Sequence, residues 1–227
     1  MIESGTEAKA CRVDVTSMDA LRTAFTSVKR TLGAVDCLVN AAGIGTGGPF
    51  IEHSEETINR ILAINVSSKL GFGTYYHVWK AALTRNQLTG TIFASQIAAA
   101  QMLEHKGGGA IVNISSIGGH AGIPGQQNAV YCATKGGVLG FTKSLATEYA
   151  KTGIRVNSIS PGFFLTKVTP GYLEQDVSRL KLFESLVPMG RFADRYELKS
   201  FAAFLLTDAA SYITGEDISV DGGVLAS

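Results

Sequence analysis

The sequence contains few cysteines and no long apolar run. Its three cysteines, Cys11, Cys37 and Cys132, have no regular spacing, which excludes a disulfide framework and indicates reduced thiols in a cytoplasmic setting. No stretch approaches the roughly 20 apolar residues that a membrane-spanning helix needs. The first ten residues, MIESGTEAKA, lack the apolar segment of a signal peptide. The sequence therefore predicts no membrane partner.

An excess of either charge is also missing. The 20 lysines and arginines offset 19 acidic residues, so the formal net charge is +1 and no basic surface for nucleic acid is indicated. No group of His, Cys, Asp and Glu has the spacing of a metal site. Hydrophobic residues make up 45% of the 227 residues, which excludes a disordered chain and favours one domain over residues 1–227.

Short apolar runs alternate with amphipathic segments along the chain. Strands are expected at 8–15, 35–43, 107–116, 154–162 and 217–223. Helices are expected from Thr16 or Ser17 to Gly33, from Ser54, and at 89–105, 128–152 and 194–207. Strands that are apolar throughout and separated by helices are typical of a parallel sheet covered on both faces. The fold class predicted is α/β, a doubly wound parallel sheet.

Tyr131 and Lys135, in the segment YCATK, are four residues apart in an expected helix. Side chains at this spacing lie about 5–6 Å apart on one helix face. A lysine charge at about 6 Å, with an effective dielectric near 20, would contribute roughly 2.8 kcal/mol. It would lower the pKa of the phenol by about two units, toward a working pH. The pair therefore predicts a general acid/base, although the same spacing also occurs by chance on many helices.

Three expected strands end close to this pair. Ser116 ends one strand, Pro161 and Gly162 form a turn at the end of another, and NAAG (40–43) ends a third. Because ligands bind at the carboxyl ends of strands in open parallel sheets, we expect these residues to share one site with Tyr131.

The order and spacing of six motifs make the chain resemble the short-chain dehydrogenase/reductase family from about Ala8 to Gly223. These motifs are DV (14–15), NAAG (40–43), IVNISS (111–116), YCATK (131–135), RVNSISPG (155–162) and YITGEDISVDGG (212–223). The resemblance implies an oxidoreductase that uses NAD or NADP on an alcohol or carbonyl. It also implies a homodimer or homotetramer, formed through the helices at 89–105 and 128–152.

The resemblance assigns catalytic roles to four residues. Tyr131 would be the general acid/base, Lys135 would lower its pKa and hold the nicotinamide ribose, Ser116 would bond the reacting oxygen, and Asn65 would anchor a water. For the cofactor, Asp14 would lie at the adenine edge, and Asn40 with Gly43 along the adenosine. The remaining cofactor-binding residues implied are Tyr131, Lys135, Pro161, Gly162, Phe164 and Thr166, of which Phe164 and Thr166 would meet the nicotinamide carboxamide.

Other interpretations stay open for several of these residues. Ser115 and Ser116 could both simply end a strand, with Ser116 the better catalytic candidate. Asp14 could be an ordinary carboxylate at a strand end. His120, in a glycine-rich loop, is expected to be exposed to solvent and not a base. Cys132 is expected to be a packed thiol and not a nucleophile.

The sequence departs from the family pattern in two places. Nothing before residue 8 resembles the family's glycine-rich phosphate loop, so the sheet is expected to lack the first two strands of the family fold. Gly43 to Gly48, GIGTGG, matches the G-x-G-x-x-G pattern, but Pro49 follows and no helix is expected before Ser54, which argues against a phosphate loop. The second departure is an insert at 67–88, which interrupts an expected helix.

Two functions remain in view. The first is an NAD(P)-dependent oxidoreductase that interconverts an alcohol and a ketone or aldehyde. The second is a truncated, catalytically inactive domain that serves as a binding or oligomerisation module or that arises from an imperfect gene model.

Residues 163–192 are expected to form a substrate lid, and their apolar side chains suggest an apolar pocket for a small-molecule substrate. The choice between NAD and NADP cannot be read from this sequence.

Overall fold

Four parallel strands form the central sheet of the structure, a computed structural model that describes residues 8, 10–45, 47–66, 90–105, 107–165 and 177–227. Their order across the sheet is β1-β2-β3-β6, and every neighbouring pair is parallel. The strands are β1 (Cys37–Asn40), β2 (Gly109–Ile114), β3 (Ile154–Pro161) and β6 (Asp217–Val220). All four lie within segments for which the sequence predicts strands.

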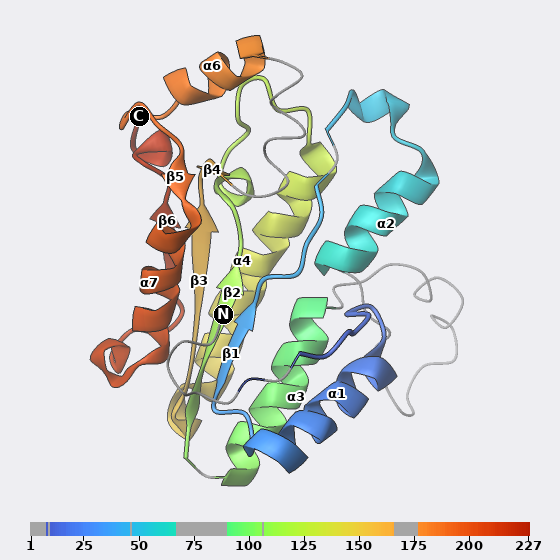
Figure 1. Ribbon diagram of the computed structural model, residues 1–227, viewed down its shortest axis with the longest axis vertical. Coiled ribbons are helices and arrows are strands. Elements are labelled where there is room, and N and C mark those ends of the chain that lie inside the picture. The colour runs from blue at the N-terminus through green and yellow to red at the C-terminus, as the bar shows by residue number, and fades with distance from the viewer. Residues whose placement is uncertain (1–7, 9, 46, 67–89, 106, 166–176) are drawn as a thin grey trace.

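Helices cover both faces of this sheet (Figure 1). Helix α7 lies on one face, and α3 and α4 lie on the other, with α1 beside α3. The α-helices are α1 (Met18–Leu32), α2 (Glu55–Val66), α3 (Gly90–His105), α4 (Ala129–Tyr149), α6 (Val177–Ser185) and α7 (Arg195–Leu206). Short 3-10 turns include η1 (Phe50–Glu52), η2 (Ile117–Gly119), η3 (Ala150–Thr152), η4 (Asp208–Ala210) and η5 (Val224–Ala226). The predicted α/β class is confirmed.

The apolar core lies in two layers, one on each side of the sheet. On the α3/α4 side, the buried residues are Ala98, Ala99, Met102, Ile111, Ala146, Ile154 and Val156. On the α7 side, they are Val112, Ile159, Leu205 and Ala210. Strands β2 and β3 alternate between the two layers and are buried on both faces, which explains why their sequences are apolar throughout. These two strands hold the sheet edge at which the site residues meet.

Local capping fixes where the predicted helices begin and end. Ser17 accepts a hydrogen bond from the backbone N–H of Ala20, and Gly33 ends the same helix with a φ of 94°. Ser54 accepts from the N–H of Thr57 at the start of α2. Such side-chain acceptors satisfy N–H groups that the first helical turn leaves unpaired. The predicted helix boundaries at these residues are confirmed.

The strand predicted at 8–15 is wrong. Residues 10–14 have no regular secondary structure, and Val15 with Thr16 forms a turn before α1. A strand exists only where a neighbour pairs with it, and β1 pairs only with β2 among the described residues. The expectation that the strand at 35–43 is buried on both faces is also wrong in part, because Cys37 and Val39 in β1 are exposed, Val39 by 42%.

Two of the expected segments lie wholly or partly outside the described residues. The insert at 67–88 lies wholly outside the described residues, and residues 166–176 of the expected lid also lie outside them. In the rest of the lid, Phe163 stacks on Phe183 and Phe192, and β4 (Phe164–Leu165) pairs with β5 (Ala193–Asp194). The described part of the predicted lid is therefore held by aromatic side chains. No helix among the described residues is both long and apolar enough to cross a membrane.

Candidate active site

Tyr131 and Lys135 lie one turn apart near the start of α4. The lysine Nζ is 5.6 Å from the centroid of the tyrosine ring, within the range expected from the spacing in the sequence. Lys135 is only 6% exposed and donates a hydrogen bond of 2.7 Å from Nζ to the carbonyl of Ile114, at the end of β2. The carbonyl therefore orients the ammonium group at the carboxyl end of the sheet.

Ser116 is the serine that faces Tyr131. A Cβ at Gly118 would lie 3.6 Å from Ser116 Oγ and 3.7 Å from the ring of Tyr131, so the two side chains are neighbours. Hydrogen bonding by Ser116 lowers the pKa of the phenol and so opposes the effect of burial. The Ser116 Oγ also accepts from the backbone N–H of Gly118 at 3.2 Å. Ser115 instead donates to the backbone carbonyl of Lys135 at 3.0 Å and is 2% exposed. Ser115 thus attaches the end of β2 to α4, whereas Ser116 is the one near the phenol.

The pKa of Tyr131 moves opposite to the direction predicted from its spacing to Lys135. Burial raises the pKa of the phenol above its usual value, and the hydrogen bond to Ser116 only offsets part of that effect. Burial also lowers the pKa of Lys135, to about 8. The prediction that the lysine lowers the pKa of the phenol below its usual value is therefore wrong. Desolvation disfavours both charged forms in this site, and spacing alone does not reveal it.

The turn that begins at Ser116 packs directly on the backbone of α4. A Cβ at Gly119 would lie 2.9 Å from the carbonyl carbon of Lys135, which is closer than real side chains come to backbone. Only glycine permits this approach. On the same turn, Gly118 is close to both Cys132 and the ring of Tyr131. Cys132 donates from Sγ to Asn128, and burial raises the pKa of its thiol, which agrees with the predicted packed thiol.

The turn at Pro161 and Gly162 lies at the end of β3, as predicted. The N–H of Gly162 donates to the carbonyl of Val220, and a Cβ at this glycine would lie 2.7 Å from the Cα of Asp221. The turn is thereby held against the end of β6. Phe164 follows in β4. The roles of these residues toward the nicotinamide stay predictions.

Residues assigned to the adenosine side of the cofactor have internal partners. The side-chain amide of Asn40 donates to Ser95 Oγ at 2.9 Å and to Asn113 Oδ1 at 2.8 Å, and Asn113 in turn donates to Thr142. This buried chain of polar groups connects β1, β2, α3 and α4. Asp14 is exposed and accepts from the N–H and hydroxyl of Thr16, which lowers the pKa of its carboxyl.

Asp14 therefore forms the turn before α1 and does not end a strand. Its chain neighbour Val15 borders a small cavity of about 180 Å³ that is also lined by Asn40 and the two residues that follow it. Gly43 lies in the loop just beyond, at 41–45. The contacts predicted between Asp14, Asn40 or Gly43 and adenosine stay predictions.

Two predicted site residues cannot be placed by their side chains. Asn65 lies in α2, but its side chain is outside the described residues, and Thr166 is outside them altogether. Their assigned roles stay predictions.

His120 is exposed, as predicted, but its imidazole ring also has partners within the fold. Its side chain is 34% exposed and is not free in solvent, because Nε2 lies 2.7 Å from Oδ2 of Asp217 and 3.1 Å from the hydroxyl of Ser160. Asp217 is 7% exposed and also accepts from Ser158 and Ser160. Sequence reasoning missed this cluster because His120 and Asp217 are 97 residues apart in the chain.

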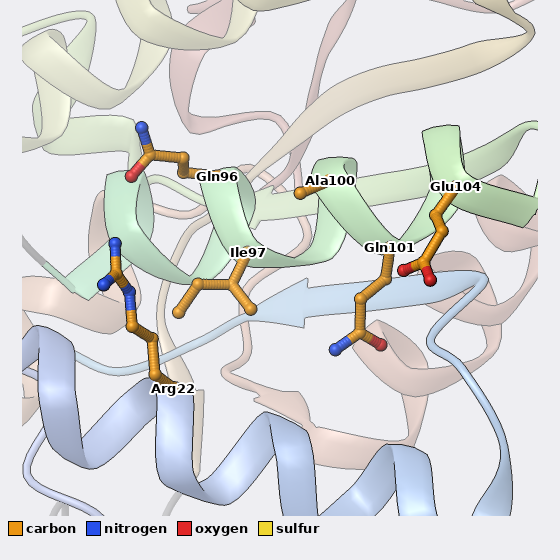
Figure 2. Close-up of a pocket in the computed structure, with 6 residues that line it drawn as sticks. All are labelled: Arg22, Gln96, Ile97, Ala100, Gln101 and Glu104. Atoms are coloured by element: carbon orange, nitrogen blue, oxygen red, sulfur yellow. The ribbon is translucent and has the colours of Figure 1, made fainter.

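Two larger cavities differ in their relation to this site. The first, about 620 Å³, borders the start of α4, and its lining contains no acidic, basic or histidine residue. Its lining residues are Gly48, Pro49, Phe50, Ile51, Gly122, Gln126, Gln127, Asn128, Ala129 and Cys132. The second, about 380 Å³, lies between α1 and α3, where Arg22 points toward α3 (Figure 2). None of the predicted site residues lines the second cavity.

The site can be tested for its fit to a nicotinamide cofactor. Two hydroxyls and one ammonium group converge at the end of β2, which suits the hydroxyls of a ribose and a reacting oxygen beside it. Gly47 and Gly48 lead through Pro49 into the 3-10 turn η1 and not into an α-helix, and α2 begins only at Glu55, where Ser54 caps it. The residues present therefore fit the nicotinamide end, and the prediction that GIGTGG is no phosphate loop is supported. No group of His, Cys, Asp and Glu within the described part of the chain could hold a metal ion.

Two family models match the chain. The model described as short chain dehydrogenase matches residues 1–72, and the model described as Enoyl-(Acyl carrier protein) reductase matches residues 74–225. Carbonyl reductase family member 4 of Xenopus tropicalis is 37% identical over 215 residues, which cover 95% of this chain and 77% of the relative.

Solved structures give the same result. A short-chain type dehydrogenase/reductase from Mycobacterium marinum superposes with a TM-score of 0.83 at 32% identity, over 98% of this chain and 78% of the other. A structure described as ElxO with NADP bound superposes with a TM-score of 0.79 at 28% identity, over 96% and 78% of the two chains. These superpositions support the Rossmann-like α/β fold of this chain. The chain belongs to the short-chain dehydrogenase/reductase family.

Proposed function

We propose that this chain is an NAD(P)-dependent oxidoreductase that interconverts an alcohol and a ketone or aldehyde, with Tyr131 as the general acid/base. The observation that carries the proposal is the placement of the Ser116 hydroxyl beside Tyr131 and near the buried ammonium group of Lys135. A phenol, a hydroxyl and a cation at one strand end are the groups that proton transfer to a carbonyl oxygen needs.

Each of the three side chains has a distinct task in this proposal. Tyr131 gives a proton to the carbonyl oxygen during reduction and removes it from the hydroxyl during oxidation. Ser116 donates a hydrogen bond to the substrate oxygen and so places that oxygen beside Tyr131. Lys135, with its Nζ 5.6 Å from the centroid of the tyrosine ring, holds the nicotinamide ribose beside the phenol, as the family motifs imply. Because burial raises the pKa of Tyr131, the site favours the neutral phenol, which is the form that donates a proton during reduction.

The bound cofactor would supply the hydride, and the chain's own residues would hold it. Lys135 and Tyr131 would bind the nicotinamide ribose, and the turn at Pro161 and Gly162 with Phe164 would border the nicotinamide. The NADP-bound relative ElxO supports a dinucleotide of this kind. Asn65 and Thr166 complete the assignment made from the family motifs. Either NAD or NADP is compatible with the residues described.

The cavity of about 620 Å³ at the start of α4 supports a largely uncharged substrate. Cys132, the neighbour of Tyr131 on α4, lines this cavity, which has no charged side chain to pair with a charged ligand. Phe163, Phe183 and Phe192 stack in the described part of the lid segment. A small alcohol or ketone with an apolar body fits these surroundings.

Two measurements on the purified chain test the proposal. The first is a fluorescence titration with NADH and with NADPH, and the second is turnover of a panel of alcohols, ketones and aldehydes followed by absorbance of the reduced cofactor. Saturable binding together with turnover is the expected result. Binding without turnover of any substrate would favour the inactive binding module. Absence of both would refute the proposed activity for this chain.

A further inference from the structure

We propose that His120 and Asp217 are a positioning pair that holds Ser116 against Tyr131. The inference rests on the proposed function, since it assigns a task within that active site. Ser116 begins the η2 turn and His120 follows its last residue, so both belong to one short segment. His120 does not touch Tyr131 in any contact described, and it acts through the turn.

The turn is attached to the fold at both ends. At its beginning, the N–H of Ser115 donates to the carbonyl of Ile159 in β3, and the Ser115 hydroxyl donates to Lys135 in α4. At its end, the ring of His120 is bound to Asp217, which lies at the start of β6. Between these ends, Gly119 lies on the backbone at Lys135. The imidazole is therefore the side chain that fixes the far end of the turn.

Asp217 is suited to be the fixed partner in this pair. Its carboxylate is 7% exposed, and burying a carboxylate is costly unless hydrogen-bond donors surround it. Ser158 and Ser160 of β3 supply two donors, and a proton on Nε2 of His120 supplies the third. The two serine hydroxyls hold the carboxylate in the sheet, which leaves the imidazole as the link to the turn.

This arrangement is not a Ser-His-Asp catalytic triad. Both Asp217 and Ser160 lie against the same imidazole nitrogen, Nε2, whereas a triad uses the two nitrogens of the ring for its two partners. Ser160 also directly precedes Pro161, so the same cluster borders the turn at the end of β3. The pair thus holds two loops of the site relative to the sheet.

A test compares three variants of one residue. His120→Leu removes the donor while keeping apolar bulk, His120→Gln keeps an N–H near the position of Nε2, and His120→Asn keeps polarity one carbon shorter. His105→Leu at the exposed end of α3 is the matched control. Because small displacements of a positioned group can lower rates by up to about 100-fold, we expect His120→Leu to lower kcat roughly tenfold or more with an unchanged KM for the cofactor. His120→Gln should restore kcat, and the control should not change it.

Hydrogen exchange of residues 116–121 provides a readout that is independent of turnover. His120→Leu should speed exchange in this turn, and His120→Gln should not. If His120→Leu does not fold, His120→Gln with wild-type kcat and His120→Asn with reduced kcat give the same support. Two results would overturn the inference and leave the proposed function standing. The first is a His120→Leu variant with the kcat and the exchange rate of the wild type. The second is a His120→Gln variant that loses as much kcat as His120→Leu. If the wild-type protein has no turnover at all, the proposed function fails, and the exchange of the turn still decides whether the pair fixes it.

Discussion

Lys135 Nζ lies 5.6 Å from the centroid of the Tyr131 ring and donates its hydrogen bond to the carbonyl of Ile114, not to the phenol. The lysine and the tyrosine are therefore neighbours that share no hydrogen bond among the described contacts. Its ammonium group is buried, which lowers its pKa to about 8, while burial raises the pKa of the phenol. Burial thus shifts the pKa values of both side chains, and these shifts should make the stability of the protein depend on pH.

The stability of the protein should rise with pH because of Lys135. Its folded pKa, about 8, lies below the value of 10.5 for an unperturbed lysine, so the unfolded chain binds more protons between these values. The free energy of unfolding should increase by up to roughly 3 kcal/mol across that window. Above about pH 10, the raised pKa of Tyr131 reverses the trend, because the folded state then holds the extra proton.

Urea unfolding at several pH values between about 7 and 10 measures this slope. Lys135→Met should lose the increase, since it has no group to titrate. A wild-type stability that falls steadily from pH 8 to pH 10 would show that the ammonium is not desolvated in solution.

Ser116→Ala should slow turnover and change its pH dependence. The substitution removes the bond that lowers the pKa of Tyr131, so the alkaline limb of the pH–rate profile should move to higher pH. Loss of one positioned donor should lower kcat on the order of 100-fold. Ser115→Ala is the comparison, because it loses a bond to the Lys135 carbonyl and should affect stability more than the profile. Equal profiles for Ser116→Ala and wild type would contradict the assignment of Ser116.

Gly119→Ala should destabilise the fold and lower activity together. The new methyl group would lie 2.9 Å from the backbone of Lys135, so the turn must move away from α4 at a cost of roughly 1–3 kcal/mol. Gly140→Ala, on α4 and with open space around the added methyl group, should stabilise the fold by about 0.5–1 kcal/mol. Thermal unfolding of both variants checks this contrast, and a Gly119→Ala variant as stable as wild type would refute the close approach.

Asn40→Leu should reduce stability and not only cofactor affinity. Its amide donates to Ser95 and Asn113 inside the protein, and the substitution leaves Asn113 without that donor, which should cost roughly 1–3 kcal/mol. Chemical unfolding alongside an NADH titration separates the two effects. Unchanged stability with lost NADH binding would instead assign Asn40 to the cofactor alone.

Local features of the fold could be predicted from the sequence, whereas features that depend on distant partners could not. Ser17, Gly33 and Ser54 set helix ends through contacts within a few residues, so their roles are visible in the sequence. The strand expected at 8–15 fails because strand formation needs a neighbour that a local pattern does not supply.

The same distinction applies to the site. The helical spacing gives the separation between Tyr131 and Lys135, but it does not give their burial, which decides the direction of both pKa values. His120 illustrates the limit most clearly. A glycine-rich loop suggests exposure, and only the folded sheet brings Asp217 against the imidazole from 97 residues away.

The central claim, that Tyr131 is the acid/base of an oxidoreductase, is tested most directly by comparing Tyr131→Phe with Tyr149→Phe. Both tyrosines lie on α4, and Tyr149 packs against the core away from Ser116. The measurement is single-turnover oxidation of NADPH or NADH with a substrate that the wild-type protein reduces, together with the dissociation constant of the cofactor. The account predicts that Tyr131→Phe loses turnover with nearly unchanged cofactor affinity, and that Tyr149→Phe keeps both. Full turnover in Tyr131→Phe would contradict it.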